Sequence, residues 1–411
     1  MYLKDFSLMS PVLQTEEVLK AIEAAIPAAA IEKAIATTQA QEERKRALPA
    51  QLMVCVVIAM SLWSRDSMRD VLKNLLDGLS EAWVLVGKSW RIPCKSAITQ
   101  ARQRLGPRVM SRLFEQIARP MATTETIGAF LNGRRIVVID GTTFDVPDSD
   151  VNARVFGRPA TRLGTQAAFP KVRLVLLIEA GTHLIFDALM CPRSKGERGR
   201  AIKLLRSVEA GMLLMWDRGL HSYAMVQATV VKGCDYLGRI PAHVKFLGEQ
   251  PLADGSYLSW IYPPSKQRKK GAKPIQIRVI EYIAEHPEKP GEQITYRLIT
   301  SLLDIEQFPA TLLAIEYHQR WEVENTIDEL KTHLLGRKTP IRSLNPREVV
   351  QEVYGWLLGH WAVRFLMFQA ATDAKIPPLR LSFTGTLRVI RRAIPKFERV
   401  QLENSPLFLP G

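Results

Sequence analysis

Three acidic residues lie where their side chains could meet and bind divalent metal ions. Asp140 closes the apolar run IVVID and Asp217 closes LLMWD, and each continuous run predicts a buried β-strand. Sites in α/β sheets form where strands end, although an aspartate at a strand end is more often a turn former or a helix cap. The third residue, Glu324, lies in the segment YHQRWEVENTIDELK, residues 317–331.

Residues 317–331 are predicted to form one helix that carries its polar groups on one face. At about 100° per residue, the side chains of Tyr317, Arg320, Glu324 and Lys331 fall within an arc of roughly 60°. An adjoining apolar stripe would seat this helix against a sheet, with Glu324 near the sheet edge. Helical spacing alone favours the alternative, an amphipathic helix whose charged face is solvated.

Two aspartates and a glutamate that converge on one point would form an all-oxygen site, which suits Mg²⁺ or Mn²⁺. Two such ions about 4 Å apart can activate a water or a 3′-hydroxyl and stabilise the leaving oxygen of a phosphodiester. Arg320 could then hold a phosphate by bidentate contact and Lys331 as a point charge.

The composition supports a polyanionic partner. In 411 residues, 56 Lys and Arg against 41 Asp and Glu give a net charge of +15, which favours nucleic acid. A membrane surface is the rival, but the best apolar segment, residues 48–63, is too short to span a bilayer and predicts a buried helix. The start of the chain lacks the pattern of a signal peptide, and four scattered cysteines indicate neither disulfides nor a zinc site. We expect a cytoplasmic protein without a membrane partner.

The elements that must position these residues belong to an α/β fold. Helical spacing dominates to about residue 126, strands alternate with a helix around the two aspartates, short β-rich runs follow, and helices return near residue 310. We expect five parts: a helical DNA-binding domain over 1–126, the first part of a catalytic core over 127–235, a β-rich insertion over 236–312, the second part of the core over 313–372, and a C-terminal region over 373–411.

Residues 96–117 form a candidate DNA-binding motif within the helical domain. The segment breaks at Gly106 and Pro107 and carries Arg102, Arg104, Arg108 and Arg112. Two short basic helices around a turn resemble a helix-turn-helix. An ordinary solvated helical hairpin explains the same pattern equally well.

The spacing Tyr317-x2-Arg320-x3-Glu324-x6-Lys331 is similar to the signature of the insertion-sequence-four (IS4) family of DDE transposases. IDGTTFDVPD around Asp140 and MWDRG around Asp217 resemble the same family, and the resemblance covers most of the chain. It implies an RNase H-like catalytic core interrupted by the β-rich insertion, with Asp140, Asp217 and Glu324 as the metal-binding triad.

The resemblance also implies an activity. Members of this family bind the terminal inverted repeats of their element, cut them by metal-dependent hydrolysis and join the freed 3′ ends to target DNA. It further implies a homodimer that joins two ends in a synaptic complex, with Tyr317, Arg320 and Lys331 near the scissile phosphate. A domesticated DNA-binding protein without catalysis and a structure-specific nuclease on the same core are the alternatives.

Two positions where family members carry an aromatic residue differ in this chain. Tyr296, 28 residues before Glu324, stands where a family member has a tryptophan that stacks on a flipped base. A tyrosine could stack on a base with less area, although a tyrosine in a β-rich run is more often a packing residue. Trp260 is a poorer candidate for this role. Leu220 also replaces an aromatic residue that members often carry three residues after the second aspartate.

A basic run in the insertion could follow a DNA backbone. It contains Arg268, Lys269 and Lys270. A solvated turn explains the run equally well.

Overall fold

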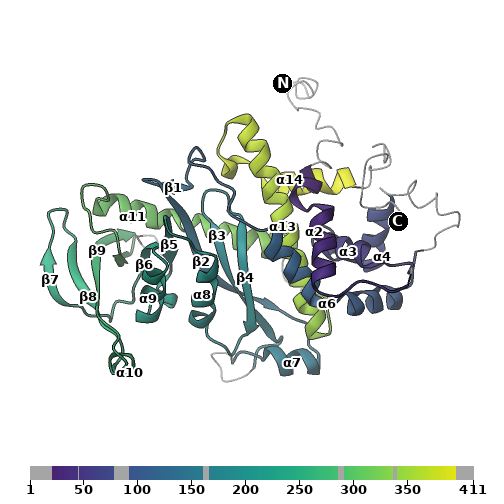
Figure 1. Cartoon of the computed structure of the whole chain (residues 1–411), viewed down its shortest axis with the longest axis horizontal. Helices are drawn as coiled ribbons and strands as arrows, with labels where there is room; N and C mark the ends of the chain where they lie inside the picture. The colour runs from purple at the N-terminus through teal and green to yellow at the C-terminus, as the bar shows by residue number, and fades with distance from the viewer. Residues whose placement is uncertain are drawn as a thin grey trace. The chain divides into compact units, whose positions relative to one another are not determined.

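The computed structural model describes residues 21–44, 46–77, 92–160, 166–285, 291–336 and 340–394. These residues form two compact units (Figure 1). One unit comprises residues 119–328. The other combines the described residues before 119 with those after 328.

The described part of the 119–328 unit contains one ten-stranded sheet. Its order is β4–β3–β2–β5–β6–β10–β9–β8–β7, and the short strand β1 pairs with β2. Strands β2, β5 and β6 are parallel to one another, and the other pairs are antiparallel. The strands are β1 (Phe130–Leu131), β2 (Arg134–Asp145), β3 (Lys171–Glu179), β4 (Ile185–Pro192), β5 (Met212–Trp216), β6 (Asp235–Arg239), β7 (Leu247–Pro251), β8 (Tyr257–Ile261), β9 (Ile275–Glu285) and β10 (Gln293–Thr300).

The two strands predicted from their apolar runs are confirmed, but Asp140 does not end its strand. Strand β2 continues to Asp145 because it pairs with β3 through to the partners Asp145 and Lys171. What ends beside Asp140 is the pairing with β5, whose last partners are Ile139 and Trp216. Asp140 therefore lies in the middle of a strand, at the point where that strand loses its parallel neighbour.

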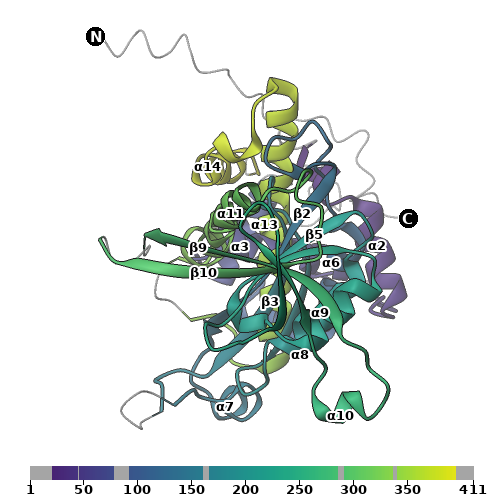
Figure 2. The same cartoon turned by 90° about the vertical axis from the view of Figure 1, so that its left-hand side faces the viewer.

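Helices cover both sides of the sheet. Figure 2 shows α8 (Arg198–Leu204) and α9 (Tyr223–Val231) on one side and α11 (Ala310–Gln319) on the other. The α8 and α9 side forms a core with Ile139, Leu214 and Trp216. The shorter helices of this unit are α7 (Asp150–Phe156), η2 (Leu205–Ser207), η3 (Arg218–Leu220) and α10 (Ser265–Arg268). The mixed α/β class predicted from the sequence is confirmed.

The β-rich residues extend the same sheet. Strands β7 to β10 continue it beyond β6, and Figures 1 and 2 show α10 at the tip of a loop that projects from β8 and β9. The basic run at Arg268 and Lys269 therefore lies at the tip of an arm.

The predicted single helix over residues 317–331 is wrong. Helix α11 ends at Gln319, α12 runs over Glu322–Asp328, and a π-helix, η4, covers Glu329–Leu334. Arg320 is the C-cap of α11, and Lys331 lies in η4, which belongs to the other compact unit. The four polar residues therefore do not share one helix face.

The other unit is helical and is organised around α13 (Pro346–Ala374). This helix packs against α3 (Ala50–Leu62) and α6 (Lys95–Ile117). The contact with α3 is close because Gly355 lies over the main chain of Val57, where a Cβ would be 2.6 Å from the carbonyl oxygen. The remaining helices are α2 (Ala28–Thr37), α4 (Met68–Asp77), η5 (Pro378–Arg380) and α14 (Phe383–Ala393). In the described ranges, no helix has both the length and the apolar character needed to cross a membrane.

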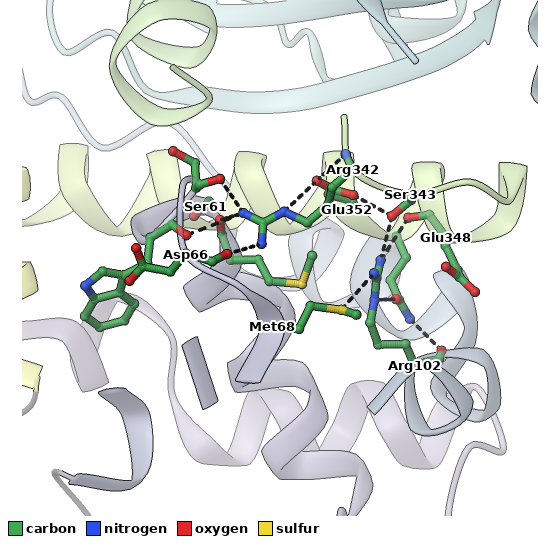
Figure 3. Close-up of polar contacts among 12 residues, drawn as sticks. Ser61, Asp66, Met68, Arg102, Arg342, Ser343, Glu348 and Glu352 are labelled. Atoms are coloured by element: carbon green, nitrogen blue, oxygen red, sulfur yellow. Dashed lines mark hydrogen bonds and ion pairs between the residues drawn. The ribbon is translucent and has the colours of Figure 1, made fainter. Parts of the chain in front are cut away.

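The predicted basic surface of residues 96–117 is wrong at Arg102. The break at Gly106 is present, with φ of 70°, but Arg102 is only 2% exposed. Its guanidinium donates to Ser343 Oγ at 3.0 Å and to Gln351 Oε1 at 2.9 Å (Figure 3). Nearby, Arg342 donates to the carbonyl oxygens of Ser64 and Asp66, close to the C-terminus of α3. Arg102 is therefore unavailable to a DNA backbone, whereas Arg104, Arg108 and Arg112 are exposed.

Candidate active site

Asp140 and Asp217 lie side by side on one face of the sheet. Ile139 and Trp216 are the last residues that pair between β2 and β5, and Asp140 and Asp217 directly follow them. Adjacent strands of a sheet lie about 4.8 Å apart. Since Ile139 and Trp216 pack into the α8 and α9 core, alternation along the strands turns both aspartates towards the opposite face, where α11 lies. The backbone N–H of Gly141 donates to Asp140 Oδ1 at 2.7 Å.

Arg320 connects Asp140 to Glu324. Its Nη1 lies 3.7 Å from Asp140 Oδ2, and its Nη2 lies 3.8 Å from Glu324 Oε1. The Arg320 side chain is 5% exposed, whereas that of Glu324 is 63% exposed. One buried guanidinium thus lies between two of the three predicted metal ligands, and the third ligand, Asp217, is close enough to act on Asp140 electrostatically.

Tyr317 fixes the end of α11 to the strand that carries Asp217. It is 1% exposed, and its hydroxyl donates to the Trp216 carbonyl oxygen at 3.4 Å. The Arg320 guanidinium lies 5.5 Å from the Tyr317 ring centroid. Both side chains therefore have protein partners in the site, and both hold Glu324 and its helix near the two aspartates.

Burial raises the pKa of Asp140 to about 6. The Gly141 N–H and the Arg320 guanidinium act in the opposite direction, and the negative charges of Asp217 and Glu324 raise the pKa further. The ionised form of Asp140 is therefore costly in the protein without a cation.

The chemistry of the donors fits a divalent cation. Three carboxylates supply only oxygen ligands. The pKa of Asp140 is raised mainly by burial and further by the negative charges of Asp217 and Glu324, so a bound cation would favour its ionised form. Within the described residues, no three Asp, Glu, His or Cys side chains already converge closely enough to hold one ion. To join the two aspartates around one ion, the exposed Glu324 side chain would have to turn inwards.

Tyr296 is a packing residue in this structure. It is 1% exposed, stacks on Tyr282 at 5.3 Å between ring centroids, and lies 4.9 Å from the ring of His318. Arg239 covers it with its guanidinium 4.2 Å from the ring centroid. Stacking on a base would require this cluster to open.

Trp260, unlike Tyr296, exposes its ring. It is 41% exposed on β8, and Tyr262, two residues later, is 45% exposed. In this structure the ring that a base could reach without rearrangement is that of Trp260 rather than Tyr296. Its strand neighbours Ser259 and Ile261 are buried, so Trp260 lies on the opposite, uncovered face of β8.

The basic arm adds charge beside Trp260. Arg268, Lys269 and Lys270 are exposed at its tip. No acidic residue occurs in the sequence between Ser256 and Ile280. The arm therefore presents cations that its own residues do not neutralise.

Two family models match the chain. The model described as "Insertion element 4 transposase N-terminal" matches residues 16–115, and "Transposase DDE domain" matches residues 131–357. The second match covers more than half of the chain and includes Asp140, Asp217 and Glu324.

Similar proteins agree with these matches. The chain is 27% identical over 357 residues to the transposase InsG for insertion sequence element IS4 of Escherichia coli K12, with 85% of this chain and 77% of that protein covered. The fold is similar to that of piggyBac transposase in its synaptic complex with hairpin DNA, with a TM-score of 0.51, 12% identity, and 95% of this chain and 82% of that chain covered. The mixed sheet is accordingly an RNase H-like core. The chain belongs to the IS4 family of DDE transposases.

Proposed function

We propose that this protein cuts the terminal inverted repeats of an insertion sequence and transfers the freed 3′ ends to target DNA. The observation that carries the proposal is the buried Arg320 guanidinium, which brings Asp140 and Glu324 together beside Asp217. Family membership supports nuclease and transferase chemistry at these carboxylates.

Asp140, Asp217 and Glu324 would hold Mg²⁺ or Mn²⁺. Two bound ions would supply a reactive hydroxyl and stabilise the leaving oxygen of the phosphodiester. Arg320 positions two of the carboxylates and offsets part of their charge before DNA arrives. Tyr317 holds α11 to the end of β5, so that Arg320 and Glu324 remain beside the aspartates.

Other basic residues would bind the DNA backbone. We assign phosphate contacts to Arg268, Lys269 and Lys270, because exposed cations at the tip of the arm suit a polyanion. We assign a further phosphate contact to Lys331 by its place in the family signature. Joining two element ends requires two active sites in one complex, so we propose a homodimer on double-stranded DNA.

The test compares two glutamates of α12. Glu324→Gln should lower cleavage of a plasmid that carries the element ends by more than the roughly 10- to 100-fold that losing an outer-shell metal partner costs. Glu322→Gln is the matched control, because Glu322 is exposed on the same helix and bonds only Asn325 among the described contacts. It should cleave like the unmodified protein.

The same assay is run with Mg²⁺ and with a chelator. Cleavage by Glu324→Gln at the unmodified rate would remove Glu324 from the mechanism. Binding of the ends without any metal-dependent nicking by the unmodified protein would favour a domesticated DNA-binding protein instead.

A further inference from the structure

A basic segment outside the assigned site borders the edge of the sheet where β5 ends. Residues 193–200 comprise the connection from β4 to α8 and the first residues of α8, and they contain four cations and one carboxylate. Arg193, Lys195 and Arg198 are exposed. Among the described residues, none of these three is within ion-pair distance of a carboxylate.

A buried arginine anchors the middle of the segment. Arg173 on β3 is 8% exposed, and its Nη1 donates to the Lys195 carbonyl oxygen at 2.9 Å. Its Nε lies 3.3 Å from Glu197 Oε1. The only carboxylate of the segment is thus turned inwards, which leaves the Lys195 ammonium on the outside.

Glu197 also packs directly against the residue that follows Asp140. A Cβ on Gly141 would lie only 2.9 Å from Glu197 Cδ, so the absence of a side chain at Gly141 makes room for this carboxyl group. Since successive residues of a strand face opposite sides, Glu197 lies across β2 from the Asp140 side chain. The segment and the aspartates therefore share one region of the sheet.

A second anchor ties the segment to the other aspartate. Arg198 Nε donates to the Gly219 carbonyl oxygen at 2.9 Å, two residues after Asp217. The segment is consequently fixed to the residues that follow both aspartates. Its position relative to the cleavage site is set by these contacts within one compact unit.

We propose that residues 193–200 bind backbone phosphates of the DNA strand that enters the active site. This inference rests on the proposed function and extends it to a second phosphate-binding surface. A DNA strand that crosses the edge of β5 would place one phosphate at the carboxylates and its neighbours at Arg193 and Lys195. Their charge would offset the repulsion between DNA and the three carboxylates before a cation binds.

The experiment measures the salt dependence of DNA binding. The cleavage-deficient Glu324→Gln protein is titrated with a fluorescent duplex of arbitrary sequence at several salt concentrations. Arg193→Gln with Lys195→Gln should make the slope of log K against log[salt] shallower by about 1.8, which is two lost phosphate contacts at about 0.9 each.

The matched control is Lys203→Gln with Lys232→Gln. It removes the same charge from two exposed lysines that line one surface hollow between α8 and α9. Lys232 follows α9 and lies just before the start of β6. Because β5 and β6 are parallel, the start of β6 is at the opposite end of the strands from Asp217, which follows the end of β5. The control should keep the parent slope.

An unchanged slope for the 193 and 195 variant, with unfolding free energy like that of its parent, would overturn the inference. The same change in slope for both double variants would also overturn it, because it would show only a general effect of net charge. A parent protein that shows no salt-dependent binding of duplex DNA would instead overturn the proposed function. Intact cleavage by the unmodified protein combined with an unchanged slope would refute the 193–200 surface alone.

Discussion

Asp140→Asn should stabilise the folded protein at neutral pH while it abolishes cleavage. Burial and the charges of Asp217 and Glu324 raise the pKa of Asp140 from 3.8 to about 6, so the folded protein favours the neutral form of this side chain. Asparagine imitates that neutral form and keeps an oxygen that can accept from the Gly141 N–H. A residue proposed for catalysis is thus expected to lower stability in the absence of metal.

The magnitude follows from the shift in pKa. A change from 3.8 to about 6 corresponds to about 3 kcal/mol at 1.36 kcal/mol for each pH unit. Attraction to Arg320 is already contained in this value, because Arg320 is one of the causes of the shift. The sign is that of an acid whose pKa is raised on folding: the penalty is absent below about pH 3.8, grows up to about pH 6, and is constant above it.

The assay is urea unfolding at pH 5 and pH 8 with a chelator present. Asp140→Asn should gain up to about 3 kcal/mol at pH 8 and roughly half as much at pH 5. Asp145→Asn is the control on the same strand. Its carboxylate is 41% exposed and paired with Lys171, so its loss should cost no more than about 1 kcal/mol. A variant at Asp140 that gains nothing at pH 8 would refute the reasoning that the buried charge is destabilising.

Three further substitutions test how aromatic side chains pack or stay exposed. Gly238→Ala should cost about 1–3 kcal/mol in unfolding free energy and slow plasmid cleavage, because its Cβ would lie 2.3 Å from the buried Trp216 ring next to Asp217; unchanged urea unfolding would contradict it. Tyr296→Ala should cost about 3–5 kcal/mol in the same unfolding measurement, as for other buried aromatic residues. Trp260→Ala should change the free energy of unfolding by less than about 0.5 kcal/mol but weaken DNA binding measured by anisotropy. Weaker DNA binding by a folded Tyr296→Ala protein, with unchanged binding by Trp260→Ala, would favour Tyr296 as the base-stacking residue.

The positions of the two aspartates could be predicted from the sequence because continuous apolar runs identify central strands. IVVI and LLMW have no polar residue that a solvated face would need, and both strands lie inside the sheet. Once they pair in parallel, the residues after them must be neighbours. This part of the site depends only on local pattern and sheet geometry.

The break at Arg320 could not be predicted because its causes are tertiary. The segment contains neither glycine nor proline, and its helical periodicity continues through the break. The contacts at the break are those of Arg320 with Asp140 and of the Tyr317 hydroxyl with the Trp216 carbonyl. Both partners come from strands more than 100 residues earlier in the chain.

The accessibility of the aromatic residues depends on what covers each face. Alternation along a strand separates two faces but does not say which one is covered. Tyr296 lies on β10, between β6 and β9, and is covered by His318 of α11, whereas Trp260 lies on β8 near the sheet edge. Arg102 is a similar case, since its buried partners Ser343 and Gln351 are about 240 residues away.

The charges at the active site explain why stability and function oppose each other there. Three carboxylates face one guanidinium, so the ionised site keeps an excess of negative charge, and burial makes that charge costly at Asp140. Filling the site with neutral side chains would remove the cost but also the affinity for a divalent cation. The Arg320 guanidinium offsets part of the negative charge of the carboxylates, while the Glu324 side chain stays exposed and free to turn inwards. In the proposed mechanism, cations at the carboxylates and basic surfaces that hold the DNA against them would balance the remaining charge.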